Sequence, residues 1–207
     1  MLLLPKQCFG CSAFIGGLFC DYCESLLMPS LKKNTLFSQK HYFFVEYNTL
    51  VKDVFHYIKF SDQQHLLSYF SNLLLELTIT PLNYDYWIPV PYHHSRLDKR
   101  GYNLLDRLFG CFFEQLGIPK LDILNRIIKT EHLFDKSLSE RQIILSRAFS
   151  FKHEPSMIKN KKILLVDDIV TTGSTMKECL SLFVSTDVSK ISVLSFAKVV
   201  LDYDKAA

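Results

Sequence analysis

An acidic pair and a cluster of hydroxyl residues follow an apolar run near the end of the chain, and together they could hold a phosphorylated sugar. The run Ile163 to Val166 is typical of a central parallel strand, and open α/β sheets bind ligands at the carboxyl ends of such strands. Asp167 and Asp168 come next. Gly173 permits an unusual backbone turn, and the N–H groups that open the following helix favour a dianion. Four residues add hydroxyl donors: Thr171, Thr172, Ser174 and Thr175.

We interpret Val166 to Thr175 (VDDIVTTGST) as a strand-to-helix loop for a ribose phosphate. Two adjacent carboxylates would repel a bare phosphate but suit ribose hydroxyls, either directly or through Mg²⁺-bound water. A simple helix N-cap would account for one Ser or Thr, but not for the acidic pair or for four hydroxyls within five residues. A Walker loop would place Lys before the Ser/Thr, where this chain has Gly173.

Two CxxC pairs near the start of the chain have the spacing of a metal site. They are Cys8, Cys11, Cys20 and Cys23, with eight residues between the pairs. Four thiolates satisfy tetrahedral Zn²⁺ with no open position, which predicts a structural zinc ion. Two redox pairs or free core cysteines are the alternatives, but a thioredoxin-like motif needs only one pair. Cys111 and Cys179 lie within helical patterns and are expected in the core.

A basic segment follows the prolines of a predicted strand. Five of the nine residues from His93 to Gly101 can carry positive charge: His93, His94, Arg96, Lys99 and Arg100. Such donors suit a pyrophosphate with Mg²⁺. With Tyr92 and Tyr102 interleaved, the same segment could hold a single-stranded nucleic acid by charge and stacking. A solvated charged loop is the remaining alternative.

Strands and helices alternate along the rest of the chain. The patterns predict strands at 42–47, 85–91, 162–168 and 191–197, and helices at 48–59, 66–77, 101–116 and 174–183. Residues 120–160 show weak periodicity, so we expect a loop with one short helix near 139–145. The alternation predicts an α/β fold with a mostly parallel sheet and helices on both faces. We expect residues 1–30 to form a small zinc-binding segment with four cysteine ligands, and 31–207 to form the main domain.

Composition sets further bounds. The chain is 48% hydrophobic, enough for a sizeable core, and its net charge of +3 means that any basic site must be local. The start MLLLPKQC does not fit a signal peptide, and no stretch approaches the roughly 20 apolar residues of a membrane helix. We therefore expect a cytoplasmic protein whose cysteines are ligands or core residues rather than disulfides.

These motifs in this order resemble the ComF family, and most closely its ComFC branch, which carries the zinc knuckle. VDDIVTTGST resembles the phosphoribosyl pyrophosphate (PRPP) signature of type I phosphoribosyltransferases. The family pattern VPVP…R…RG(F/Y)NQ is matched at Val90, Pro91, Arg96, Arg100, Gly101, Tyr102 and Asn103, with Leu104 in place of the last Gln. A later family segment is matched at Ser137, Arg141, Ala148 and Phe149.

The resemblance implies a type I phosphoribosyltransferase-like fold and roles for the motifs. By it, Asp167 and Asp168 hold the ribose 2′ and 3′ hydroxyls of PRPP, with Mg²⁺, and Thr171 to Thr175 hold the 5′-phosphate. Arg96 and Arg100 would contact pyrophosphate or nucleic acid. The family also implies natural transformation, in which the protein handles incoming single-stranded DNA beside the DNA-uptake machinery, peripheral to the inner membrane.

Three functions stay open at this point. The first, which we favour, is a competence factor that binds PRPP or a ribose phosphate and contacts single-stranded DNA. The second is an active Mg²⁺-dependent phosphoribosyltransferase, in which a base displaces pyrophosphate while Mg²⁺ and the two arginines neutralise charge. The third is a structural zinc module on a degenerate enzyme fold, which would bind no ligand in the cleft.

Overall fold

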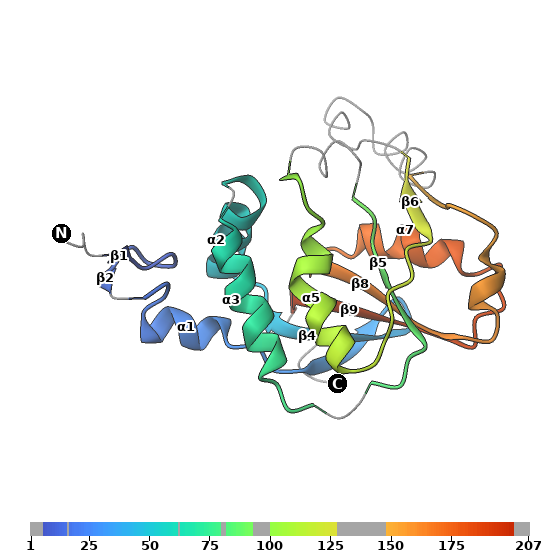
Figure 1. Ribbon diagram of the computed structural model, residues 1–207, viewed down its shortest axis with the longest axis horizontal. Coiled ribbons are helices and arrows are strands. Elements are labelled where there is room, and N and C mark those ends of the chain that lie inside the picture. Colours follow the sequence, from blue (N-terminus) through green and yellow to red (C-terminus); the bar gives the residue numbers. More distant parts are fainter. Residues whose placement is uncertain are drawn as a thin grey trace.

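A five-stranded sheet of order β3-β4-β9-β8-β5 forms the centre of the computed structural model (Figure 1). The structure describes residues 6–15, 17–61, 63–79, 82–92, 100–127 and 148–200. The strands are β3 (Lys32–Leu36), β4 (Gln39–Glu46), β5 (Tyr86–Pro89), β8 (Lys162–Val170) and β9 (Lys190–Lys198). All neighbours pair in parallel except β3, which is antiparallel to β4. The predicted mostly parallel α/β sheet is confirmed.

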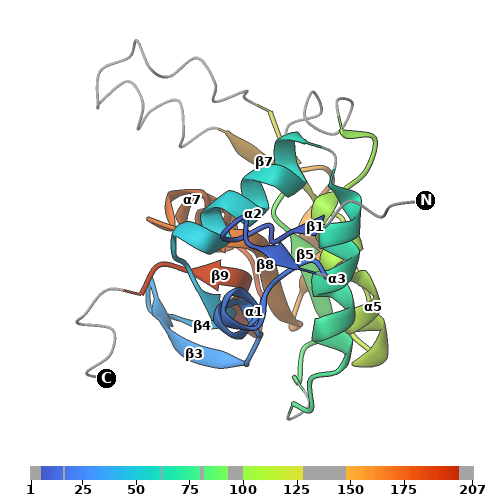
Figure 2. The ribbon, with the colours of Figure 1, turned by 90° about the vertical axis from the view of Figure 1, so that its left-hand side faces the viewer.

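Helices cover both faces of the sheet, as predicted (Figures 1 and 2). One face is covered by α2 (Thr49–Phe60), α3 (Gln64–Leu75) and α5 (Leu104–Gln115). The other is covered by α7 (Ser174–Leu182) and the short strands β6 (Leu124–Arg126) and β7 (Phe149–Phe151). Within the described ranges no helix is long and apolar enough to cross a membrane.

Strand β8 sends alternate side chains to the two faces, which decides where the acidic pair lies. Leu164 and Val166 belong to the core beneath α2, α3 and α5, whereas Ile163 and Leu165 belong to the core beneath α7. Since successive side chains of a strand point to opposite faces, Asp167 and Asp168 continue on opposite sides of the sheet.

The sequence-based expectations differ from the structure in the length of β8 and in several additional short elements. Strand β8 continues through Val170, which pairs with Lys198, so the aspartates lie inside the strand and not in a loop that begins at Val166. Strand β3 and the β6–β7 pair were not expected: β3 is a polar edge strand, and β6 and β7 have three residues each, too few to show a pattern. The expected helix near 139–145 lies outside the described residues.

The N-terminal segment packs against the helical face of the main domain. It contains β1 (Lys6–Gln7), β2 (Phe14–Ile15), the α1 helix (Asp21–Leu27) and two turns, and it lies over α2 and α3 in Figure 2. Its buried residues Cys8, Phe19, Cys23 and Leu27 join the same core as the side chains of α2 and α3. A domain boundary at residue 30 therefore stays a prediction.

Candidate functional site

The turn between β8 and α7 encloses a small cavity at the carboxyl end of the sheet. Asp167 and the residues from Ile169 to Met176 line a volume of about 60 Å³. The Thr172 and Ser174 hydroxyl oxygens lie 2.8 Å apart. Helix α7 begins after Gly173, which provides no side-chain cap, although the Ser174 N–H donates to Thr172 Oγ1 at 3.4 Å. The residues of its first turn, Ser174 to Met176, line the cavity with their N–H groups at the positive end of the helix. This arrangement is chemically suited to an anion.

Gly173 is required by its backbone and by its neighbour. Its φ of +77° lies in the left-handed region, and a Cβ there would stand 2.9 Å from Cε2 of Phe37. Phe37 belongs to the tight turn between β3 and β4, where it and Ser38 both have positive φ values of 49° and 64°. A strained hairpin turn thus holds an aromatic ring against the turn before α7.

Asp168 is held by a cation and a phenol on the helical side of the sheet. Lys59 of α2 places its Nζ 2.8 Å from Asp168 Oδ2, and the Tyr92 hydroxyl donates to the same oxygen at 2.6 Å. Burial would raise the pKa of Asp168, but the charge and hydrogen bond of Lys59 and the Tyr92 hydrogen bond lower it below its ordinary value. Asp168 is therefore a paired carboxylate.

Asp167 has the opposite electrostatic environment. Two causes raise the pKa of Asp167 to about 7: burial, which is the larger, and the negative charge of Asp168. The N–H of Asp168 donates to Asp167 Oδ1 at 2.8 Å, which partly offsets that rise. The pKa values of the two adjacent carboxylates are thus shifted in opposite directions, because the pleat gives them different partners.

Arg100 lies beside the Asp168 cluster. Its guanidinium carbon is 5.5 Å from the Tyr92 ring centre, and its Nη2 donates to the Lys59 carbonyl at 3.5 Å. Its Nε is buried and has no hydrogen-bond partner within the described part of the chain. The predicted Arg96, and with it His93 and His94, falls outside the described residues.

Lys59 and Phe37 are the site residues that sequence reasoning missed. Lys59 lies near the end of an amphipathic helix, where a single lysine is an ordinary surface residue. Phe37 follows a polar strand and precedes a serine, without a Gly or Asn to indicate a hairpin turn. Neither position carries a local signal, since each depends on a contact with a distant segment.

The four predicted metal ligands come together. The sulfurs of Cys8, Cys11, Cys20 and Cys23 all lie within 4.8 Å of one another, and those of Cys11 and Cys20 are 3.7 Å apart. Tetrahedral thiolates at about 2.3 Å from zinc are about 3.8 Å apart, so the cluster fits a metal ion such as zinc. The backbone N–H groups of Gly10 and Cys20 both donate to Cys8 Sγ at 3.3 Å, an arrangement that stabilises a thiolate.

Gly10 allows the first turn of the cluster to approach the second. A Cβ at Gly10 would lie 2.7 Å from Cys23 Sγ and 2.6 Å from a methyl group of Leu50. Any larger residue would push the first cysteine pair away from the second and from α2. The cysteine cluster and the packing of this segment against the main domain therefore depend on the same glycine.

A family comparison agrees with this geometry. Residues 113–203, which contain β8, α7 and β9, match the family described as the phosphoribosyl transferase domain. The adenine phosphoribosyltransferase of Leishmania tarentolae resembles the chain with a TM-score of 0.41 and 14% identity over 85% of this chain and 87% of that one. That score is too low to carry an argument, so the sheet topology and the family match define the class: a protein with a phosphoribosyltransferase-type domain.

Curated relatives narrow the class. Competence protein F of Haemophilus influenzae is 36% identical over 112 residues, which cover 54% of this chain and 49% of that protein. Competence protein ComFC of Streptococcus pneumoniae is 28% identical over 73% of this chain and 65% of its own. DNA utilization protein YhgH of Shigella flexneri is 27% identical, covering 72% and 67% respectively. The matched part thus spans about half to two thirds of these relatives.

The chain thus carries a phosphoribosyltransferase-type domain and an N-terminal four-cysteine cluster, and it is similar to competence proteins of the ComF family.

Proposed function

We propose that this protein serves DNA utilization in natural transformation by binding PRPP with Mg²⁺ and by contacting incoming single-stranded DNA. The observation that carries the PRPP part is the cavity between Asp167 and the first turn of α7. Its volume of about 60 Å³ suits one phosphate group rather than a whole ligand, for which pockets are typically about 300 Å³ or more. The DNA part is supported by the names of the relatives, competence and DNA utilization proteins.

In this proposal each part of the site has a separate task. Thr171 to Thr175 hold the 5′-phosphate through N–H groups and hydroxyls. Asp167 and Asp168 accept hydrogen bonds from the ribose hydroxyls. Mg²⁺ would be held by oxygens of PRPP and by water molecules. Asp168 accepts a ribose hydroxyl with the lone pairs that its bonds to Lys59 and Tyr92 leave available. Arg100, with its buried Nε, and Lys59 are the described cations beside Asp168 that we assign to the pyrophosphate.

Isothermal calorimetry with PRPP and Mg²⁺ tests the assignment. Asp167→Asn keeps the shape of the side chain but removes its charge, and we expect at least a tenfold loss of affinity with an unchanged melting profile. Asp187→Asn is the matched control, because Asp187 is exposed and lies in the connection before β9, at the opposite end of the strands from the phosphate turn. Equal affinity in the wild-type protein and Asp167→Asn would contradict the assignment of the site.

An active phosphoribosyltransferase is the second candidate. The cations Lys59 and Arg100 beside Asp168 favour it, since they could neutralise charge as pyrophosphate leaves C1 of the ribose. Release of pyrophosphate in the presence of a purine or pyrimidine base, and its loss in Asp167→Asn, would establish transfer. Tight PRPP binding without pyrophosphate release for any base would establish the binding role alone.

The third candidate, a structural zinc module on a degenerate fold, makes the opposite prediction. A ligand that binds only the native state raises its melting temperature. PRPP with Mg²⁺ should therefore raise the midpoint of thermal unfolding by several degrees if the proposed site is functional. No shift at millimolar PRPP would favour the structural module.

A further inference from the structure

A second, larger cavity lies between the cysteine segment and the helices α2 and α3. Its volume is about 760 Å³, within the usual range for small-molecule sites. The lining residues come from three separate segments of the chain: Gln7, Cys8, Phe9, Ser12, Gly17, Leu18, Tyr57 and His65. None of these described lining residues is acidic, so the cavity offers no carboxylate to repel an anion.

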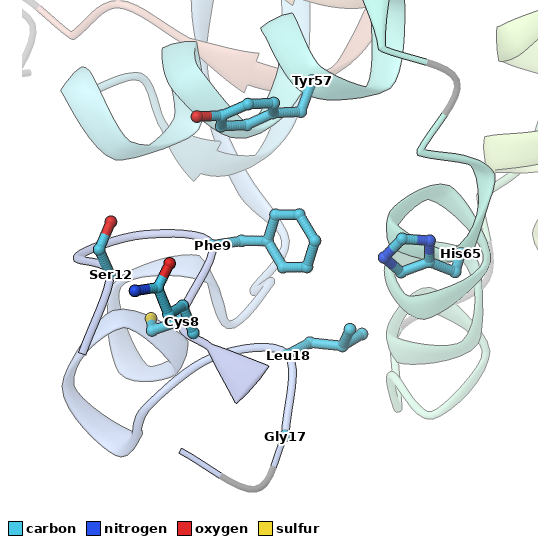
Figure 3. Close-up of a pocket in the computed structure, with 8 residues that line it drawn as sticks. Cys8, Phe9, Ser12, Gly17, Leu18, Tyr57 and His65 are labelled. Atoms are coloured by element: carbon cyan, nitrogen blue, oxygen red, sulfur yellow. The ribbon is translucent and has the colours of Figure 1, made fainter. Parts of the chain in front are cut away.

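The walls of this cavity are ring systems. Figure 3 shows Phe9 pointing across to His65, with Tyr57 on one side and Leu18 on the other. The Phe9 ring centre is 5.4 Å from that of His65 and 6.1 Å from that of Tyr57. Tyr57 is 42% exposed, so its ring is not fully buried in the core. Flat faces with Gln7 and Ser12 at the edge suit a planar heterocycle that also forms hydrogen bonds.

A line of guanidinium groups and aromatic rings leads from the first turn of α3, which also carries His65, to the Asp168 cluster. The guanidinium group of Arg107 is hydrogen-bonded to Gln64, which precedes His65, and its carbon lies 4.4 Å from the Tyr102 ring centre. Arg100 follows, 5.9 Å from Tyr102 and 5.5 Å from Tyr92. Cations that alternate with rings are the means by which proteins bind unpaired strands, the cations on phosphates and the rings on bases.

The last turn of α2 joins the two sites. Tyr57 faces the cavity, while the carbonyls of Ile58 and Lys59 accept hydrogen bonds from Tyr102 and Arg100, each at 3.5 Å. The Lys59 side chain continues to Asp168. One helical turn therefore borders the aromatic cavity, the guanidinium line and the candidate PRPP site.

We propose that the cavity between Phe9, Tyr57 and His65 holds one unpaired base of a single-stranded nucleic acid, whose backbone follows Arg107 and Arg100 toward the phosphate turn. The proposal rests on the DNA handling proposed above and gives it a location. A base on Tyr57 and Phe9 contributes by stacking, and the strand contributes by charge, so the binding tolerates many sequences but requires a base.

Fluorescence anisotropy with labelled dT20 and with an abasic strand of equal charge tests this proposal in the zinc-loaded chain of residues 1–207. Stacking of one base contributes roughly 1–3 kcal/mol, so Tyr57→Leu should weaken dT20 binding by about tenfold and remove the preference over the abasic strand. Tyr57→Phe keeps the ring and should bind within twofold of the wild type. Phe60→Leu removes an exposed ring of the same helix that does not line the cavity, and should leave binding unchanged.

Each other outcome has a definite meaning. Wild-type affinity for dT20 in both Tyr57→Leu and His65→Leu would overturn the cavity assignment, while the DNA role would stand. If thymidine monophosphate competes as strongly as unlabelled dT20, the cavity binds a free nucleotide, and the proposal that it binds a base of a strand is overturned. No binding of dT20 by the wild-type protein would refute the DNA role and the cavity together. PRPP calorimetry on the same samples reports separately on the phosphate turn.

Discussion

The phosphate turn and the aromatic cavity are built in opposite ways. The turn encloses about 60 Å³ and is lined by one segment of the chain, from Asp167 to Met176, at a single strand–helix junction. The cavity uses three segments, encloses about 760 Å³, and depends on how the cysteine cluster packs against α2 and α3. A contiguous site keeps its shape as long as its own turn folds, whereas an assembled site is lost when any one of its segments moves.

Removal of one cysteine ligand should have the largest effect and separate the two regions. Cys11→Ser changes an exposed thiol, so the core is undisturbed, but the metal loses one of four ligands. We expect loss of bound metal, a midpoint of unfolding lower by about 5–10 °C, and dT20 binding weakened more than tenfold. PRPP affinity should stay within twofold.

Metal analysis and calorimetry on the purified variants check this prediction. Cys111 was predicted in the core, but it is exposed on the outer side of α5, whereas Cys179 is buried as predicted. Cys111→Ser, away from the cluster, is therefore the matched control. It should keep the metal and the wild-type melting temperature. A Cys11→Ser protein with a full complement of metal would show that the four thiolates are not the ligand set.

Lys59→Met should cost about 2 kcal/mol of stability, because it leaves the Asp168 carboxylate buried without its cation. The folded-state pKa of Asp168 is lowered, so this contribution is present above the unfolded pKa and is lost as the pH falls through the folded pKa. The difference between variant and wild type should thus be largest near neutral pH and disappear in strong acid.

Urea denaturation between neutral pH and strong acid measures the free energy of unfolding of wild type and variants. Lys59→Arg is the variant that retains the positive charge. Lys59→Arg should lose less than half as much stability as Lys59→Met. A pH-independent difference for Lys59→Met would indicate that lost packing of the lysine stem, rather than the ion pair, is responsible.

Gly173→Ala should weaken PRPP binding about tenfold and cost about 1–2 kcal/mol, since the new Cβ meets Phe37 and the backbone needs a positive φ. Gly117→Ala is the control: its φ is also positive, at 68°, but a Cβ there would meet no atom within 4 Å. Gly117→Ala should therefore lose about 1 kcal/mol and keep wild-type PRPP affinity by calorimetry. Equal affinities in the two variants would argue against the phosphate turn.

The smallest expected effect is a pH dependence of PRPP binding. The pKa of Asp167 is raised to about 7, so the free protein holds a proton there below that pH, and a ribose hydroxyl needs the ionised carboxylate as acceptor. Affinity should fall by up to about tenfold per pH unit below 7. The same raised pKa makes the protonated form favourable to folding, so stability contributed by Asp167 is lost as the pH rises through 7.

The protonation of PRPP itself also changes with pH, so Asp167→Asn serves as the reference protein. The ratio of wild-type to variant affinity should rise between pH 6 and pH 8. A ratio that stays constant over this range would mean that Asp167 does not change its charge on binding PRPP.

The sequence determined much of the fold and the contiguous part of the site. The four cysteines were identified from spacing, and the acidic pair and the hydroxyl cluster from their place after an apolar strand. Adjacent residues of a strand point to opposite faces, but this applies to Asp167 and Asp168 only because β8 extends to Val170 and includes them both.

The rest could not be predicted, because it depends on contacts between distant segments. Lys59 reaches Asp168 across 109 positions of the chain, and Phe37 reaches Gly173 across 136 (168 − 59 and 173 − 37). The cavity of Phe9, Tyr57 and His65 needs the packing of the cysteine segment on α2 and α3. Nothing in the residue types alone distinguishes these rings from ordinary core aromatics.

Hydrogen exchange of the first turn of α7, measured with and without PRPP and Mg²⁺, tests the central claim most directly. Gly173 gives this turn no side-chain N-cap, so the N–H groups of Thr175 and Met176 should exchange quickly in the free protein and become protected when a phosphate accepts their hydrogen bonds. The account predicts protection concentrated in residues 171–176 at saturating ligand. Saturation without any change in that segment would contradict it.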